Sequence, residues 1–151
     1  MDIFFVSNEK PRSYNDNGKK KKIYKDTLKR EFQRRYQSLY SGLPISDETL
    51  QAHITYIHQI GAQGQQPDAD NLSKPLIDAF CGVIYCDDRQ VIRRTADILA
   101  LKDFDFVTVD ASSMPYEVYS DFQTFFNRKE KNIIFFAVSS FLPSQIKVGV
   151  I

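Results

Sequence analysis

The segment Leu50–Ile60, with the sequence LQAHITYIHQI, alternates between apolar and polar side chains and decides much of the fold. Its even-numbered positions are mainly apolar and its odd-numbered positions are mainly polar. Successive side chains of a β-strand point to opposite faces, so this pattern predicts a strand with one buried face. We expect this strand to lead into the acidic segment that follows it.

Apolar runs on either side of this segment predict further strands. One is expected at residues 3–6, one or two within residues 91–109, and a closing strand at residues 133–141. The closing run is apolar at both odd and even positions. We therefore expect that strand to be central in the sheet or covered on both faces.

Apolar residues at helical spacing predict helices at residues 25–40, 71–80 and 115–127. Residues 8–22 are predicted to form a loop, because they contain several turn formers and the four consecutive lysines Lys19–Lys22, which repel one another. The predicted strands and helices follow one another along the chain without a regular βαβ repeat. The sequence thus predicts an α+β (mixed α/β) fold, a single compact domain in which helices flank a mixed sheet. It would span residues 1–151, with a basic loop and helix at 8–40 and an extended helix–strand segment at 104–151.

The length and composition fit one domain of this kind, with 151 residues of which 42% are apolar and 26% are charged. No run approaches the roughly 18 apolar residues of a membrane span, and the first residues lack the pattern of a signal peptide. We therefore expect a cytoplasmic protein that does not associate with a membrane.

The net charge of +1 hides a strong asymmetry along the chain. Residues 1–36 hold eleven lysines and arginines against five acidic residues, whereas the remaining residues hold nine against fourteen. The basic part could hold a polyanion while the acidic part supplies carboxylates for a metal ion. A solvated charged helix is the alternative explanation of the basic part.

Carboxylates cluster in the segment after the predicted strand, where Asp68 and Asp70 are followed by Asp87 and Asp88. If Asp68 and Asp70 lie in extended backbone, both carboxylates face one side. Asp88, or its neighbour Asp87, could complete the group once the intervening helix brings the chain back. Three such carboxylates could hold Mg²⁺, which would offset the repulsion among them.

Lys74 is the natural positive counterpart of these carboxylates. It lies inside the helix that Asp70 or Asn71 is expected to cap, where it could stabilise a phosphate or a leaving oxygen. The alternative is purely structural: Asp68, Asp70 and Asn71 cap a helix, and Asp87 and Asp88 form a turn. The combination of all these residues favours a metal site.

The pattern D-x-D-N-x-x-K-x-x-x-D over residues 68–78, followed by D-D-x-x-V over residues 87–91, resembles the RusA-type Holliday-junction resolvases. The resemblance implies a small, homodimeric endonuclease that depends on a divalent metal, Mg²⁺ or alternatively Mn²⁺, and nicks branched DNA at four-way junctions. It matches Asp68, Asp70 and Asp88 to the metal-binding catalytic aspartates and Lys74 to the catalytic lysine. Supporting positions around these groups are expected at Asn71, Asp78 and Asp87.

DNA is expected to run over the basic part of the chain, held mainly through its phosphates. The residues predicted to contact it are Lys19, Lys20, Lys21, Lys22, Arg30, Arg34, Arg93 and Arg94. Two other functions stay open from the sequence. One is a DNA-binding or junction-binding protein without catalytic activity, and the other is a related nuclease that acts on flaps or RNA.

Overall fold

The sheet of this protein has the strand order β1–β4–β2–β3 in the computed structural model, which describes residues 1–13, 16–59, 68–102 and 105–149. Its strands are β1 (Ile3–Ser7), β2 (Leu50–Gln59), β3 (Val91–Leu101) and β4 (Asn132–Ser140). β4 is antiparallel to both β1 and β2, whereas β2 and β3 are parallel. The sheet is therefore mixed, as the sequence predicts.

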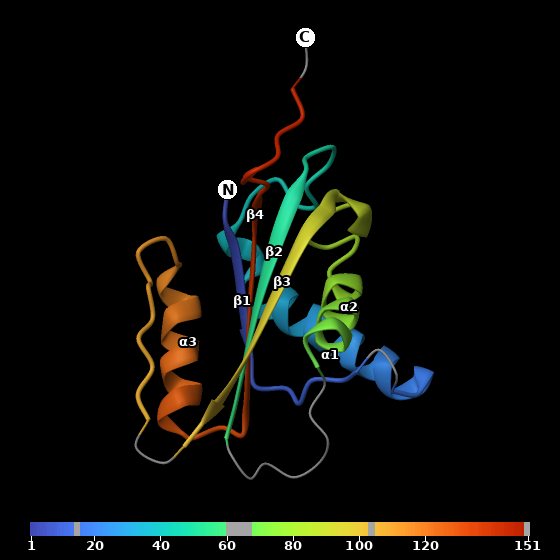
Figure 1. Ribbon diagram of the computed structural model, residues 1–151. Helices are drawn as coiled ribbons and strands as arrows, with labels where there is room; N and C mark the ends of the chain where they lie inside the picture. The colour runs from blue at the N-terminus through green and yellow to red at the C-terminus, as the bar shows by residue number, and fades with distance from the viewer. Residues whose placement is uncertain (14–15, 60–67, 103–104, 150–151) are drawn as a thin grey trace.

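Helices lie on both sides of this sheet (Figure 1). α1 (Gly18–Arg35) and α2 (Ala69–Ala79) are on one side, and α3 (Tyr116–Asn127) is on the other. Two short 3₁₀ turns complete the described part of the chain: η1 (Gln37–Leu39) follows α1, and η2 (Asp88–Gln90) immediately precedes β3. The predicted fold class, a single compact α+β domain, is confirmed.

The strands predicted from the apolar pattern agree closely with the structure. The first and last strands and β2 lie within one residue of their expected bounds, although Ile60, Phe104 and the other residues outside the described ranges cannot be compared. The region 91–109 provides one strand in its described part, β3. β4 pairs with a neighbour on each side, so the expectation of a central closing strand is confirmed.

The prediction for the basic segment was wrong at its start. Lys19–Lys22 are helical, because α1 begins at Gly18 and ends at Arg35 rather than spanning residues 25–40. The side chain of Asn17 caps the helix by accepting the backbone N–H of Lys20 at 2.9 Å. Successive side chains of a helix lie about 100° apart, so the four lysines point in different directions and their repulsion is weakened.

Aromatic rings fill the space between the sheet and the α1–α2 layer. The ring of Phe80, at the C-terminal end of α2, lies 5.1 Å from that of Phe5 and 5.2 Å from that of Phe136. Phe32 of α1 contacts the same ring at 5.7 Å. All four side chains are fully buried. This cluster fixes α2 against the sheet, so its polar residues project on the opposite, exposed side.

Within the described ranges, none of the helices has the length and apolar character needed to cross a bilayer.

Candidate active site

Asp68 and Asp70 lie at the start of α2 and not in extended backbone together. Asp68 is the extended residue that caps the helix, and its Oδ1 accepts the backbone N–H of Asn71 at 2.9 Å. Asp70 is already in the first helical turn, where its negative charge interacts favourably with the helix dipole. The expected alternation across a strand was therefore wrong, and so was the expectation that Asp70 or Asn71 caps the helix. Capping by Asp68 starts the helix two residues earlier than predicted.

Lys74 lies between two carboxylates that come from different parts of the chain. Its Nζ is 3.0 Å from Oδ1 of Asp78, one turn further along α2, and 3.8 Å from Oδ2 of Asp88 in η2. The three side chains are only 28–42% exposed, so their charges are screened less than those of fully exposed groups. Asp70 lies one turn before Lys74 on the same helix. The structure thus brings Lys74, Asp78 and Asp88 together, with Asp70 nearby on α2.

The turn that carries Asp88 is attached to α2 through Tyr85. The buried hydroxyl of Tyr85 donates a hydrogen bond of 2.5 Å to the carbonyl of Ile77. Burial raises the pKa of this hydroxyl well above its ordinary value, so it stays a neutral donor. This bond holds the chain just before η2 against α2, which brings Asp88 close to Lys74.

Asp87 faces a different set of partners from its neighbour Asp88. Its carboxylate accepts hydrogen bonds from the Arg89 side chain, the shortest at 2.7 Å, and from the Arg89 backbone N–H. These bonds lower the pKa of the Asp87 carboxyl to about 2. The side chain of Gln90 accepts the backbone N–H of Asp87 and donates to the carbonyls of Ile45 and Glu48. Asp87 therefore shapes the turn, which fits its predicted supporting role.

The residues expected to hold Mg²⁺ match it in donor chemistry. Asp68, Asp70 and Asp88 all offer carboxylate oxygens, the ligands that hard divalent cations prefer. In the described part of the chain, however, no three acidic, histidine or cysteine side chains lie close enough together to hold a metal ion. Asp68 faces its own helix, and Asp88 faces Lys74. Binding of Mg²⁺ by these three residues requires the carboxylates at the start of α2 to turn toward Asp88.

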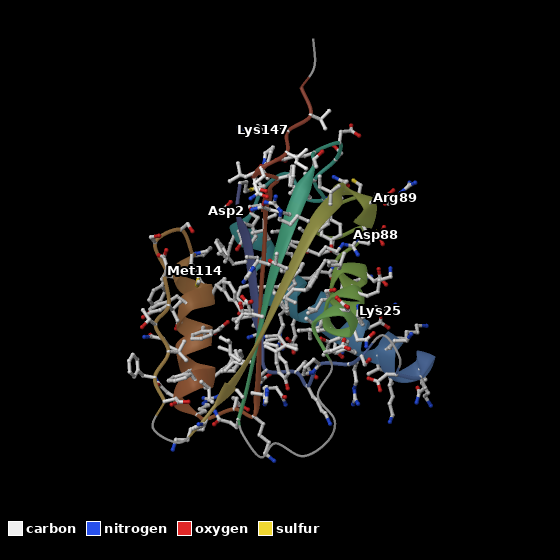
Figure 2. The ribbon with its side chains drawn as sticks, in the orientation of Figure 1. Asp2, Lys25, Asp88, Arg89, Met114 and Lys147 are labelled. Carbon is white, nitrogen blue, oxygen red and sulfur yellow. The ribbon has the colours of Figure 1, made fainter. Side chains whose placement is uncertain are left out.

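The basic residues of α1 form an exposed cationic surface beside α2. Lys19, Lys20, Lys22, Arg30 and Arg34 are all exposed, while the buried face of the helix carries Tyr24, Leu28 and Phe32. Lys21 is half-buried. Figure 2 shows Lys25 of the same helix and Asp88 on one side of the sheet. The predicted DNA-contacting residues of α1 thus share a side of the molecule with the candidate site.

Arg93 and Arg94, both predicted to contact DNA, lie on opposite faces of β3 because strand side chains alternate. The Arg93 guanidinium donates to the carbonyl of Leu142 at 2.8 Å and lies 4.8 Å from the centre of the Phe141 ring. It therefore holds the segment after β4. Arg94 points to the α2 side and donates to the backbone carbonyls of Asp88 and Val91.

Two residues at the site were not identified from the sequence, namely Tyr85 and Gln90. Their hydrogen bonds join positions that are far apart along the chain or lie in irregular backbone. No local pattern indicates such contacts. The pairing of Lys74 with Asp78 did have a local signal, the four-residue spacing of opposite charges on a helix.

A known protein family matches most of this chain. Residues 5–105 match the family model described as Endodeoxyribonuclease RusA. This stretch contains the last three residues of β1, all of β2, β3, α1 and α2, and every residue of the candidate site. A search of curated proteins found no match. Because the family match covers about two thirds of the 151 residues, the chain belongs to the RusA endodeoxyribonuclease family.

Proposed function

We propose that this protein is a metal-dependent, structure-selective endonuclease that resolves four-way DNA junctions by paired phosphodiester hydrolysis in recombination and repair. The observation that carries the proposal is the position of the Lys74 ammonium against Asp78 and Asp88, within the matched family region. An ammonium group that is held among carboxylates, beside a cationic helix, can bind a phosphodiester and stabilise the negative charge that develops on it. We place this activity in the cytoplasm.

In the proposed reaction, Asp68, Asp70 and Asp88 would hold Mg²⁺ or Mn²⁺, which would supply Lewis-acid polarisation of the scissile phosphate and activation of the attacking water. Lys74 stabilises the negative charge that grows on the phosphate oxygens. Asp78 orients the ammonium of Lys74 through their 3.0 Å ion pair. The products are a 5′-phosphate and a 3′-hydroxyl.

The α1 cationic surface, made of Lys19, Lys20, Lys22, Arg30 and Arg34, would bind the phosphate backbone. Contacts of this kind recognise the shape of a junction without reading its sequence. A junction has two equivalent strands to be cut, and two active sites related by a two-fold axis cut them most simply. We therefore propose that a homodimer is the active form.

Comparing substrates tests this function directly. Four-way, flap, linear-duplex and single-stranded DNA, together with RNA, are incubated with Mg²⁺, Mn²⁺ or Ca²⁺, and the cut sites are mapped. We expect paired symmetric nicks in the four-way junction with Mg²⁺ or Mn²⁺. Junction binding without cleavage would favour a non-catalytic binding protein, and preferred cleavage of flaps or RNA would favour a related nuclease. Sedimentation of the protein–junction complex measures whether two copies bind.

Replacing Lys19, Lys20 and Lys22 together with glutamine is expected to weaken junction binding and to reduce its dependence on salt. Glutamine keeps a good helix propensity, so α1 is expected to remain folded. Each lost phosphate contact reduces the slope of log K against log salt by about 0.9. Titrations in Ca²⁺ at several salt concentrations measure the slope. The matched control is replacement of the exposed Lys102 and Lys131 by glutamine. A triple variant with the wild-type slope would show that these lysines are merely solvated.

A further inference from the structure

The short turn that carries Asp88 has little regular structure of its own. η2 is three residues long, and Asp88 is its first residue. A single 3₁₀ turn provides few internal hydrogen bonds, so neighbouring groups must fix the direction of its side chains. The distance of 3.8 Å between Asp88 and Lys74 therefore depends on what holds this turn in place.

Arg94 holds the turn from the β3 side. Its Nη2 donates to the backbone carbonyl of Asp88 at 3.1 Å, and its Nε donates to the carbonyl of Val91 at 3.2 Å. The carbonyl of Asp88 also accepts the backbone N–H of Val91. Two nitrogens of one planar guanidinium thus set the positions of both carbonyls at the end of the turn. One of these carbonyls belongs to the same residue as the candidate metal ligand.

The electrostatic surroundings of Arg94 agree with this role. Tyr85 lies close enough to Arg94, Asp78 and Asp88 for all three charges to influence its hydroxyl. The guanidinium lies against the backbone carbonyl of Asp88, so its positive charge is placed at the same turn. Its Nε and Nη2 donate to the protein backbone, in contrast to the donors of a side chain that reaches out to phosphate.

We propose that Arg94 is a positioning residue that orients Asp88 for metal binding and does not contact DNA phosphate. This inference rests on the proposed function, since it assigns Arg94 a task at the same site. It replaces the prediction that Arg94 belongs to the DNA-contacting residues. The substitution Arg94→Lys separates the two roles, because lysine keeps the positive charge but lacks the planar pair of donors.

Arg94→Lys is expected to bind four-way DNA in Ca²⁺ with the affinity and salt slope of the wild type. Its cleavage rate is expected to fall by about 10- to 100-fold, the usual effect of losing a residue that orients a metal ligand, and its Mg²⁺ half-saturation to rise about tenfold. Calorimetric titration of the protein with Mn²⁺ in the absence of DNA is expected to show the same loss of metal affinity. That measurement does not depend on cleavage.

Arg94→Gln serves as the second variant, and Arg128→Lys, at the exposed end of α3, is the matched control. Thermal unfolding verifies that each variant is folded, and Arg94→Gln takes the place of Arg94→Lys if the latter is not. A salt slope that falls by about 0.9 in Arg94→Gln, with wild-type metal affinity, would identify a phosphate contact and overturn the inference. Wild-type rate and metal affinity in Arg94→Lys would also overturn it. If the wild-type protein cleaves no substrate, the proposed function fails, while the Mn²⁺ titration still decides the role of Arg94.

Discussion

Replacing Asp70 with asparagine is expected to abolish DNA cleavage while the protein remains folded and binds four-way DNA. The change removes one carboxylate charge with almost no change in volume. Asp70 is exposed in the first turn of α2, so no buried contact is lost. Loss of a metal ligand removes several kcal/mol of transition-state stabilisation. The measurements are nicking in Mg²⁺ and gel-shift affinity in Ca²⁺.

Asp2→Asn is the matched control, because it makes the same chemical change at an exposed carboxylate away from the candidate site (Figure 2). This variant is expected to cleave like the wild type. Asp70→Asn with a rate within tenfold of the wild type would remove Asp70 from the ligand set. Equal loss of binding and cleavage would instead indicate that Asp70 affects the DNA complex and not the chemical step.

Replacing Lys74 with methionine is expected to lower the cleavage rate by roughly 100- to 1,000-fold at saturating Mg²⁺. This is the usual loss when one group that stabilises a developing oxyanion is removed. Metal affinity is expected to stay the same or increase, because the ammonium now beside Asp78 and Asp88 repels a cation. Single-turnover cleavage and calorimetric titration with Mg²⁺ measure the two effects separately.

Two comparisons make the test of Lys74 specific. Lys131→Met removes an exposed lysine between α3 and β4 and is expected to have no effect on the rate. Asp78→Asn weakens the ion pair that orients Lys74 and is expected to produce a smaller loss than Lys74→Met. Wild-type turnover in Lys74→Met would exclude Lys74 from the reaction, and lower metal affinity would show that it supports the metal ligands.

Much of the fold could be predicted because its strands carry strong local patterns. β2 alternates over most of its length, and β4 is apolar on both faces because it lies inside a sheet that has helices on both sides. The start of α1 was missed because the repulsion among four adjacent lysines was expected to prevent a helix there. The decisive factor was the cap formed by Asn17, together with the divergence of helical side chains. A prediction that considers only the charges of neighbouring residues does not take this geometry into account.

The candidate site was predictable in its residue types and less so in its geometry. Spacing and family resemblance identified Asp68, Asp70, Lys74 and Asp88, but not which of them meet. From the sequence, Asp68 is compatible both with extended strand backbone and with a helix cap. In the structure it caps α2, because its carboxylate accepts the backbone N–H of Asn71. Arg94 contacts carbonyls only three and six residues before it, in the irregular backbone of the turn. Arg93, by contrast, contacts Leu142, almost fifty residues away in the sequence. Such contacts exist only once the sheet is assembled.

The position of β4 also has a consequence for the order of events during protein synthesis. β4 joins β1 to β2, yet it is the last of the described strands to be made, and Ile3 pairs with Val138. The residues of the candidate site all precede residue 95 and leave the ribosome while β1 still has no strand partner in the described sheet. Pairing over such sequence distances is slow, because the long loop must close before its contacts form. We therefore expect the sheet beneath the candidate site of a nascent chain to stay incomplete until residues up to 140 have emerged.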